Sequence, residues 1–88
     1  MNLRKQNRRQ IQTMRKNMRL LREQRNWSMK KLSEVSGIDE KTLNDIETGG
    51  DFGIAHLIQL CSLYHIKPRD IFFPVNNNPA VPQNDPEE

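Results

Sequence analysis

Apolar side chains recur with helical spacing in the first third of the chain. They follow one another at steps of three, four and three residues, as Ile11, Met14, Met18 and Leu21. This spacing places all four on one face of an α-helix, and the other faces are polar and mostly basic. The pattern therefore predicts an amphipathic helix that buries this face and ends near Arg25.

Two short helices are predicted next, each opened by a capping residue. Ser28 and Asp39 have side-chain oxygens that accept hydrogen bonds from the free amides of a helix's first turn. Gly37 ends the first of these helices, because glycine readily takes the left-handed conformation that follows a helix, and a glycine pair ends the second. We expect the two helices at about 28–36 and 39–48, separated by a tight turn.

The following segments predict two more helices. Residues 54–64 are almost all apolar, so we expect them to form the central buried helix. Pro68 suits the first turn of a short last helix over residues 68–73. Together these patterns predict an all-α domain of five helices.

Both ends of the chain depart from this pattern. Residues 1–12 are mostly Arg, Lys, Gln and Asn, which indicates either a flexible arm or a frayed extension of the first helix. Residues 74–88 contain four prolines, four asparagines and three acids. Such a segment buries too little surface to offset the entropy of ordering it, so we expect a disordered acidic tail.

The distribution of charge is more informative than the net charge of +3. Residues 1–31 contain eleven Lys or Arg and one acid, whereas residues 32–88 contain three Lys or Arg and ten acids. The asymmetry indicates either a polyanion-binding end or a solvated helix face, and charge alone leaves both open.

Composition excludes several classes of protein. The single cysteine, Cys61, allows no disulfide within the chain, the apolar runs are too short to span a bilayer, and no secretory h-region follows the basic N-terminus. We therefore expect a cytoplasmic, nucleoid-associated protein with no membrane partner. No catalytic residue, metal site or cofactor site can be assembled from the motifs present, so we expect no enzyme, no cofactor and no small-molecule effector.

The segment between the first and fourth helices has a familiar sequence. It reads WSMKKLSEVSGIDEKTLNDIETG from Trp27 to Gly49, with Leu21-Arg22 upstream and LIQLCSLYHI over residues 57–66 downstream. This ordered set resembles the phage-repressor/Cro (XRE) family of helix-turn-helix DNA-binding transcriptional regulators. The resemblance covers about residues 14–73 and implies a five-helix, λ-repressor-like domain. The expected organisation is a basic N-terminal arm over 1–13, the helix-turn-helix domain over 14–73, and a Pro/Asn-rich acidic tail over 74–88.

The resemblance also implies which residues contact DNA. The third helix would enter the major groove, and the base-reading residues would be Glu40, Lys41, Thr42, Asn44 and Asp45. Phosphates would be bound at the start of the second helix, at the end of the third and along the arm, by Ser28, Met29, Lys30, Lys31, Thr48, Arg4, Lys5, Arg8 and Arg9. A structural ion pair between Arg22 and Glu47 would hold the third helix; the alternative is that Glu47 is an ordinary surface acid.

Some positions depart from the family pattern. Met29 stands where members usually have glutamine, and the loop over residues 50–53 lacks their basic, proline-containing sequence. The third helix also contains several acids, which phosphates repel. One interpretation is a homodimeric, sequence-specific regulator of double-stranded DNA, with repression as the expected mode. The other is a protein-interaction module on the same fold, antitoxin-like or part of an anti-repressor, whose acidic third helix binds a protein.

Overall fold

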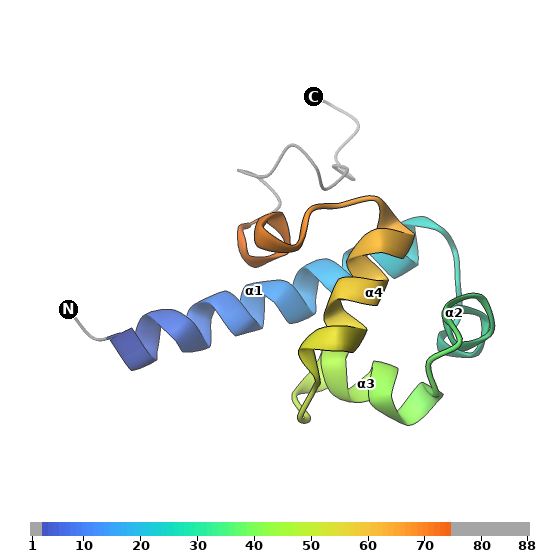
Figure 1. The fold of residues 1–88 in the computed structure, drawn as a ribbon, viewed down its shortest axis with the longest axis horizontal. Coiled ribbons are helices and arrows are strands. Elements are labelled where there is room, and N and C mark those ends of the chain that lie inside the picture. The colour runs from blue at the N-terminus through green and yellow to red at the C-terminus, as the bar shows by residue number, and fades with distance from the viewer. Residues whose placement is uncertain (1–2, 75–88) are drawn as a thin grey trace.

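The computed structural model describes residues 3–74, and their side chains from residue 7 onward. It contains four α-helices and a 3₁₀-helix, with no strand in the described part (Figure 1). The elements are α1 (Leu3–Gln24), α2 (Met29–Ser36), α3 (Glu40–Thr48), α4 (Ile54–Tyr64) and η1 (Pro68–Phe72). The predicted all-α class is confirmed. The predicted disordered tail lies, apart from Pro74, outside the described residues.

The predicted fifth helix is a single 3₁₀ segment and not an α-helix. Its bonds are of the i to i+3 kind, from the Asp70 amide to the Lys67 carbonyl and from the Phe73 amide to the Asp70 carbonyl. Pro74 disfavours the helical conformation for the residue before it, and Phe73 is accordingly extended, with φ −110° and ψ 147°. The element must therefore end at Phe72, too early for a full α-helical segment.

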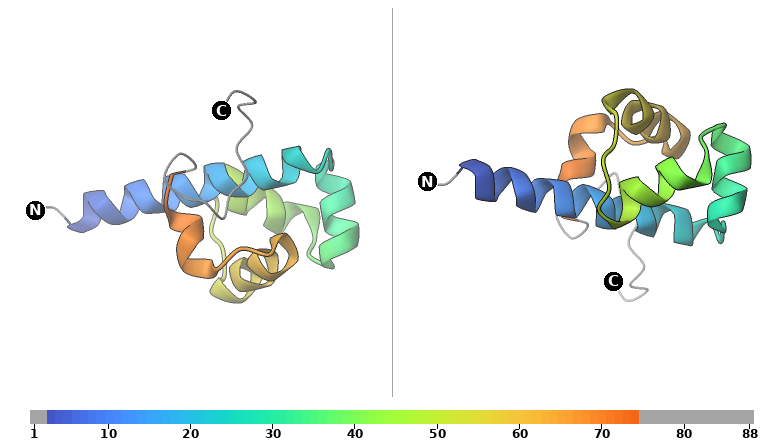
Figure 2. Two further views of the ribbon diagram at one scale, coloured as in Figure 1. Left: turned by 90° about the horizontal axis from the view of Figure 1, so that it is seen from above. Right: turned by 90° about the horizontal axis from the view of Figure 1, so that it is seen from below.

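The first helix begins much earlier than an arm over residues 1–13 would allow. α1 runs without interruption from Leu3 to Gln24, so no boundary separates residues 13 and 14. Its sequence has neither glycine nor proline and is rich in Arg, Lys, Gln, Leu and Met, which all favour helix. At 1.5 Å per residue it is about 33 Å long. Figure 2 shows its first turns extending beyond the other helices.

Local caps define the two central helices where the sequence predicted them. The Ser28 hydroxyl accepts from the Lys31 amide at 3.0 Å, and the Asp39 carboxylate accepts from the Thr42 amide at 3.1 Å. Gly37 lies in the left-handed region at φ 78°. The predicted caps are therefore confirmed, and three residues connect α2 to α3.

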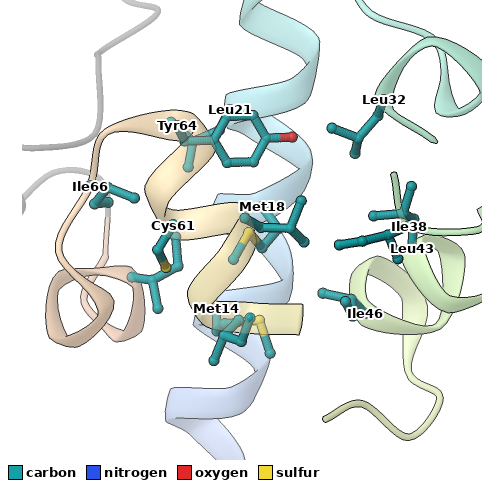
Figure 3. Close-up of a cluster of buried hydrophobic side chains, with 13 residues drawn as sticks. Met14, Met18, Leu21, Leu32, Ile38, Leu43, Ile46, Cys61, Tyr64 and Ile66 are labelled. Carbon is teal, nitrogen blue, oxygen red and sulfur yellow. The ribbon is translucent and has the colours of Figure 1, made fainter. Parts of the chain in front are cut away.

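The core forms where α1, α3 and α4 meet (Figure 3). α1 contributes Met14, Met18 and Leu21, and the other helices and turns contribute Leu32, Ile38, Leu43, Ile46, Leu57, Leu60, Cys61, Tyr64, Ile66 and Ile71. α4, expected to be the central buried helix, contributes four of these buried residues but leaves Ile54 and Ile58 64% and 47% exposed. A domain this small has too few elements to cover every face of α4.

A buried amide links the two ends of the domain. Asn17 of α1 lies in the core, and its side-chain nitrogen donates to the carbonyls of Ile71 and Phe73, at 2.8 Å each. Carbonyls at the end of a short helix lack partners within it, so this amide satisfies groups that burial would otherwise leave unpaired. Asn17 therefore fixes η1 against α1.

Candidate nucleic-acid interface

α3 has one face in the core and one in solvent. Leu43 and Ile46 are buried, whereas Glu40, Lys41, Asn44 and Thr48 are exposed, at positions that helical spacing aligns on one edge. These four residues are named the α3 edge below. α3, which bears this edge, lies at the lower side of the molecule in Figure 1. It is the part of the helix that another molecule can contact.

An ion pair joins the buried side of α3 to α1. The Arg22 guanidinium donates from Nε and Nη2 to the Glu47 carboxylate, at 2.9 and 3.0 Å. Its Nη1 donates to the Trp27 carbonyl at 2.9 Å, so the group also holds the turn before α2. The Glu47 side chain is only 4% exposed, which excludes its being an ordinary surface acid. Hydrogen bonding to Glu47 raises the pKa of Arg22 and favours its charged form.

A second arginine, to which the sequence analysis gave no role, holds the same end of α3. Arg15 donates to the carbonyls of Asp45, Ile46 and Gly50 at 2.7, 3.0 and 3.0 Å. Its guanidinium also lies 5.4 Å from the centre of the Phe52 ring. The available sequence signal is that Arg15 precedes Arg22 by seven residues, two helical turns, and so shares its face. The two arginines thus fix the C-terminal half of α3.

Two of the predicted base-reading residues contact each other. Lys41 Nζ lies 3.0 Å from Asp45 Oδ2, and the bond raises the pKa of Lys41. The Lys41 side chain is 84% exposed, whereas that of Asp45 is 28% exposed and lies against Gly50. A Cβ at Gly50 would be 2.5 Å from the Asp45 carboxyl carbon, so only glycine permits this approach. Lys41 and Asp45 therefore neutralise each other in the free protein.

Thr42 and Thr48, predicted to contact bases and phosphate, have hydroxyl groups engaged within α3. Thr42 Oγ1 donates to the Asp39 cap at 2.8 Å, and Thr48 Oγ1 donates to the Asn44 carbonyl at 2.7 Å. Each hydroxyl oxygen retains acceptor capacity but has already used its proton. Neither can donate to DNA without giving up that internal bond.

The start of α2 exposes two lysines. Lys30 and Lys31 are exposed, whereas Met29 is half-buried and packs against the core. The Ser28 hydroxyl already accepts from the Lys31 amide. The amides of Met29 and Lys30 are first-turn amides with no partner inside the helix. This end therefore presents backbone donors and two cations together, a combination that suits a phosphate.

The predicted arm residues belong to α1. Arg8 and Arg9 are exposed on it. The backbones of Arg4 and Lys5 lie in the same helix, and their side chains lie outside the described part of the structure. Within the described residues no helix is long and apolar enough to cross a membrane. The same part of the chain contains no group of three or more His, Cys, Asp or Glu side chains that could hold a metal ion.

The chain was also compared with known proteins. A family model described as Helix-turn-helix matches residues 18–71, which is more than half of the chain. The chain belongs to the XRE/Cro-type helix-turn-helix family. No curated protein and no solved structure matches it.

Membership of this family indicates what the surfaces of α2 and α3 do. The match spans the Arg22–Glu47 pair, the end of α1, both short helices, α4 and most of η1. Domains of this family bind DNA and are generally not enzymes. The α3 edge and the start of α2 are therefore surfaces of a DNA-binding domain.

Proposed function

We propose that the protein is a sequence-specific transcriptional regulator that reads double-stranded DNA in the major groove with α3. The observation that supports this most strongly is the asymmetry of α3. Its buried side is fixed to α1 by Arg15 and Arg22, whereas the α3 edge is exposed. A reading helix needs both properties, because base contacts discriminate only when the helix is held in a fixed register.

The proposed base contacts follow from side-chain chemistry. Lys41 donates to guanine O6 and N7, and Asn44 forms two hydrogen bonds with adenine. Glu40 or Asp45 accepts from the cytosine amino group, and Thr42 contacts the edge of the site. The proposed phosphate contacts come from Ser28, the Met29 amide, Lys30, Lys31, Thr48 and the basic residues of α1, namely Arg4, Lys5, Arg8 and Arg9.

The acids of α3 oppose DNA binding less than their number suggests. Asp39 caps the helix, Glu47 is bound by Arg22, and Asp45 is paired with Lys41. Within Glu40–Thr48, Glu40 is then the one acid that is exposed with no ion pair among the described residues. The Lys41–Asp45 pair must open before either side chain contacts a base, as it must before Asp45 binds a basic protein. In the free protein the pairing lowers the net negative charge that α3 presents to phosphates, and this supports the DNA-reading function.

A homodimer is part of the proposal. A single small module buries limited surface on DNA, and two copies on a two-fold symmetric site combine their contacts. Occupation of such a site would block access by other proteins, which makes repression the proposed mode. The proposed place of action is the cytoplasm, on the nucleoid.

Affinity selection of the full chain on a randomised duplex library, at near-physiological salt, tests this function. We expect enrichment of a two-fold symmetric motif. Retention of DNA without enrichment would contradict sequence-specific reading. If no DNA is retained, regulation through DNA is wrong and the protein-interaction module becomes the better explanation.

A pair of variants tests the assignment of α3. Lys41→Ala should change the preferred base at one position in each half-site, because it removes one base-edge donor. Lys67→Ala removes the same charge from an exposed position outside α3 and should leave the motif unchanged. An unchanged motif for Lys41→Ala would show that another face of the domain contacts the bases.

A further inference from the structure

An open groove of about 460 Å³ lies between α1 and the C-terminal end of α3. Its α1 wall includes Arg9, Gln12, Lys16 and Arg19, and its α3 wall consists of Glu47 and Thr48. This is named the α1–α3 groove below. Figure 2 shows α3 beside the middle of α1, where these residues lie. The groove is separate from the start of α2 and from the base-reading positions of α3.

The groove has a strongly positive lining. Arg9, Lys16 and Arg19 are exposed, and the half-buried Arg15 adds a further cation to the lining. The one acid in the lining, Glu47, is compensated by its two hydrogen bonds to Arg22. Low exposure and close pairing keep the carboxylate from repelling an anion in the groove.

The exposed cations of the groove are available to a ligand. Arg19 has a partner in Glu23, but Nε and Oε2 are 3.9 Å apart and both side chains are more than half exposed. Such a surface pair is weak and exchanges readily with another anion. The ligand that suits these groups is an extended polyanion, because the cations are distributed along a helix and are not focused on one point.

The groove continues the α3 edge. Thr48 is both the last residue of that edge and part of the groove wall. A duplex whose major groove holds α3 would therefore bring one of its strands to the groove. Arg9 and Arg19 are ten residues apart, about 15 Å along α1. Over that length along the duplex axis one DNA strand presents about four phosphates.

We propose that the α1–α3 groove holds the sugar–phosphate backbone that flanks the bases read by α3, and that Lys16 and Arg19 are phosphate-binding residues. This inference rests on the proposed function and extends it to a surface outside the helix-turn-helix motif itself. Because residues 3–13 are helical, α1 is about 10 Å wide and does not fit the minor groove of B-DNA, which is about 6 Å wide. Its basic residues therefore bind along a backbone and do not enter a groove.

Binding of the full-length chain to duplex DNA, measured by fluorescence anisotropy over a series of salt concentrations, tests the proposal. The groove variant combines Lys16→Gln and Arg19→Gln, which preserve helix propensity and remove two charges. The matched control combines Lys67→Gln and Arg69→Gln, which remove two exposed charges near η1, on the far side of α1 from α3 in Figure 1. Circular dichroism establishes that each variant is folded.

We expect the plot of log affinity against log salt to become shallower by about 1.8 for the groove variant, because each lost phosphate contact removes about 0.9. The groove variant should lose affinity by the same factor on the selected site and on a scrambled duplex, since phosphate contacts carry no sequence information. The control should keep the wild-type slope.

A groove variant that keeps the wild-type salt slope would overturn this inference while the proposed function stands. A control variant whose salt slope falls as much as that of the groove variant would overturn it too. A wild-type chain that binds no duplex would overturn the proposed function itself. The two failures are therefore distinguishable in one set of measurements.

Discussion

Arg15 of α1 donates a 3.0 Å hydrogen bond to the carbonyl of Gly50, thirty-five residues further along the chain. The same guanidinium reaches the carbonyls of Asp45 and Ile46, the last turn of α3. The Asp45 carbonyl also accepts from the Gly49 and Gly50 amides, so Arg15 adds a charged donor from α1 to the end of α3, where helical carbonyls lack partners in the next turn. A cation at a helix C-terminus also interacts favourably with the helix dipole. Arg15 therefore helps to fix the position of α3, together with the Arg22–Glu47 pair.

Replacing Arg15 with alanine should lower the free energy of unfolding by about 1–3 kcal/mol, because three carbonyls lose a charged donor. Arg15→Lys should lose most of the same stability, since one ammonium group cannot reach three carbonyls with the geometry of a guanidinium. Urea denaturation monitored by circular dichroism measures both changes. Lys16→Ala, at the neighbouring exposed position, should stay within about 0.5 kcal/mol of wild type. An Arg15 variant as stable as Lys16→Ala would contradict the assigned role.

Removing Arg22 should be more damaging. Arg22→Ala leaves the nearly buried Glu47 carboxylate without its partner, and such a loss costs about 3–5 kcal/mol. The double variant Arg22→Met with Glu47→Leu should recover part of this loss, because it removes the uncompensated charge as well. Both are measured by urea denaturation.

The surface pair Arg19–Glu23 provides the control for that experiment. It joins the same residue types on α1 at 3.9 Å, with both side chains exposed. Arg19→Ala should change the free energy of unfolding by no more than about 0.5 kcal/mol. Equal effects of Arg22→Ala and Arg19→Ala would mean that burial does not strengthen the Arg22–Glu47 pair.

The cap of α3 makes stability depend on pH in the acid range. Hydrogen bonds from the Thr42 hydroxyl, and secondly from the Thr42 amide, lower the pKa of Asp39 below its ordinary value of 3.8. The unfolded chain therefore binds more protons than the folded chain in this range. The contribution of Asp39 to stability is then complete above about pH 3.8 and is lost as the pH falls through the lower, folded-state pKa.

Asp39→Asn should remove this component, because asparagine still caps the helix but does not titrate between pH 2 and 5. Urea midpoints measured over that range should fall less steeply with decreasing pH for the variant than for wild type. Parallel curves would show that other carboxylates determine the acid sensitivity and that the Asp39 cap is not coupled to folding.

Local features of the domain were predictable because their causes lie within a few residues. Ser28 and Asp39 each accept from an amide three residues later, and Gly37 takes the conformation that ends α2. The apolar spacing from Met14 to Leu21 likewise defined a buried face. By contrast, helix propensity left open whether residues 3–12 were a loose arm or helix, since isolated polar segments of that length are marginal.

The sequence by itself thus determined α2 and α3 with their caps, the buried face of α1 and the family, since spacing and residue type are properties of neighbouring residues. Only the tertiary structure decided which side chains hold α3 and η1 in position. Arg15 bonds to carbonyls at least thirty positions away, and Asn17 bonds to Ile71, fifty-four positions away. Residue type does not separate Arg15 from the exposed Lys16, because the partners of Arg15 are main-chain carbonyls that have no sequence signature. The seven-residue spacing to Arg22 indicates a shared face but not these partners. The same holds for the α1–α3 groove, which exists only where two packed helices meet.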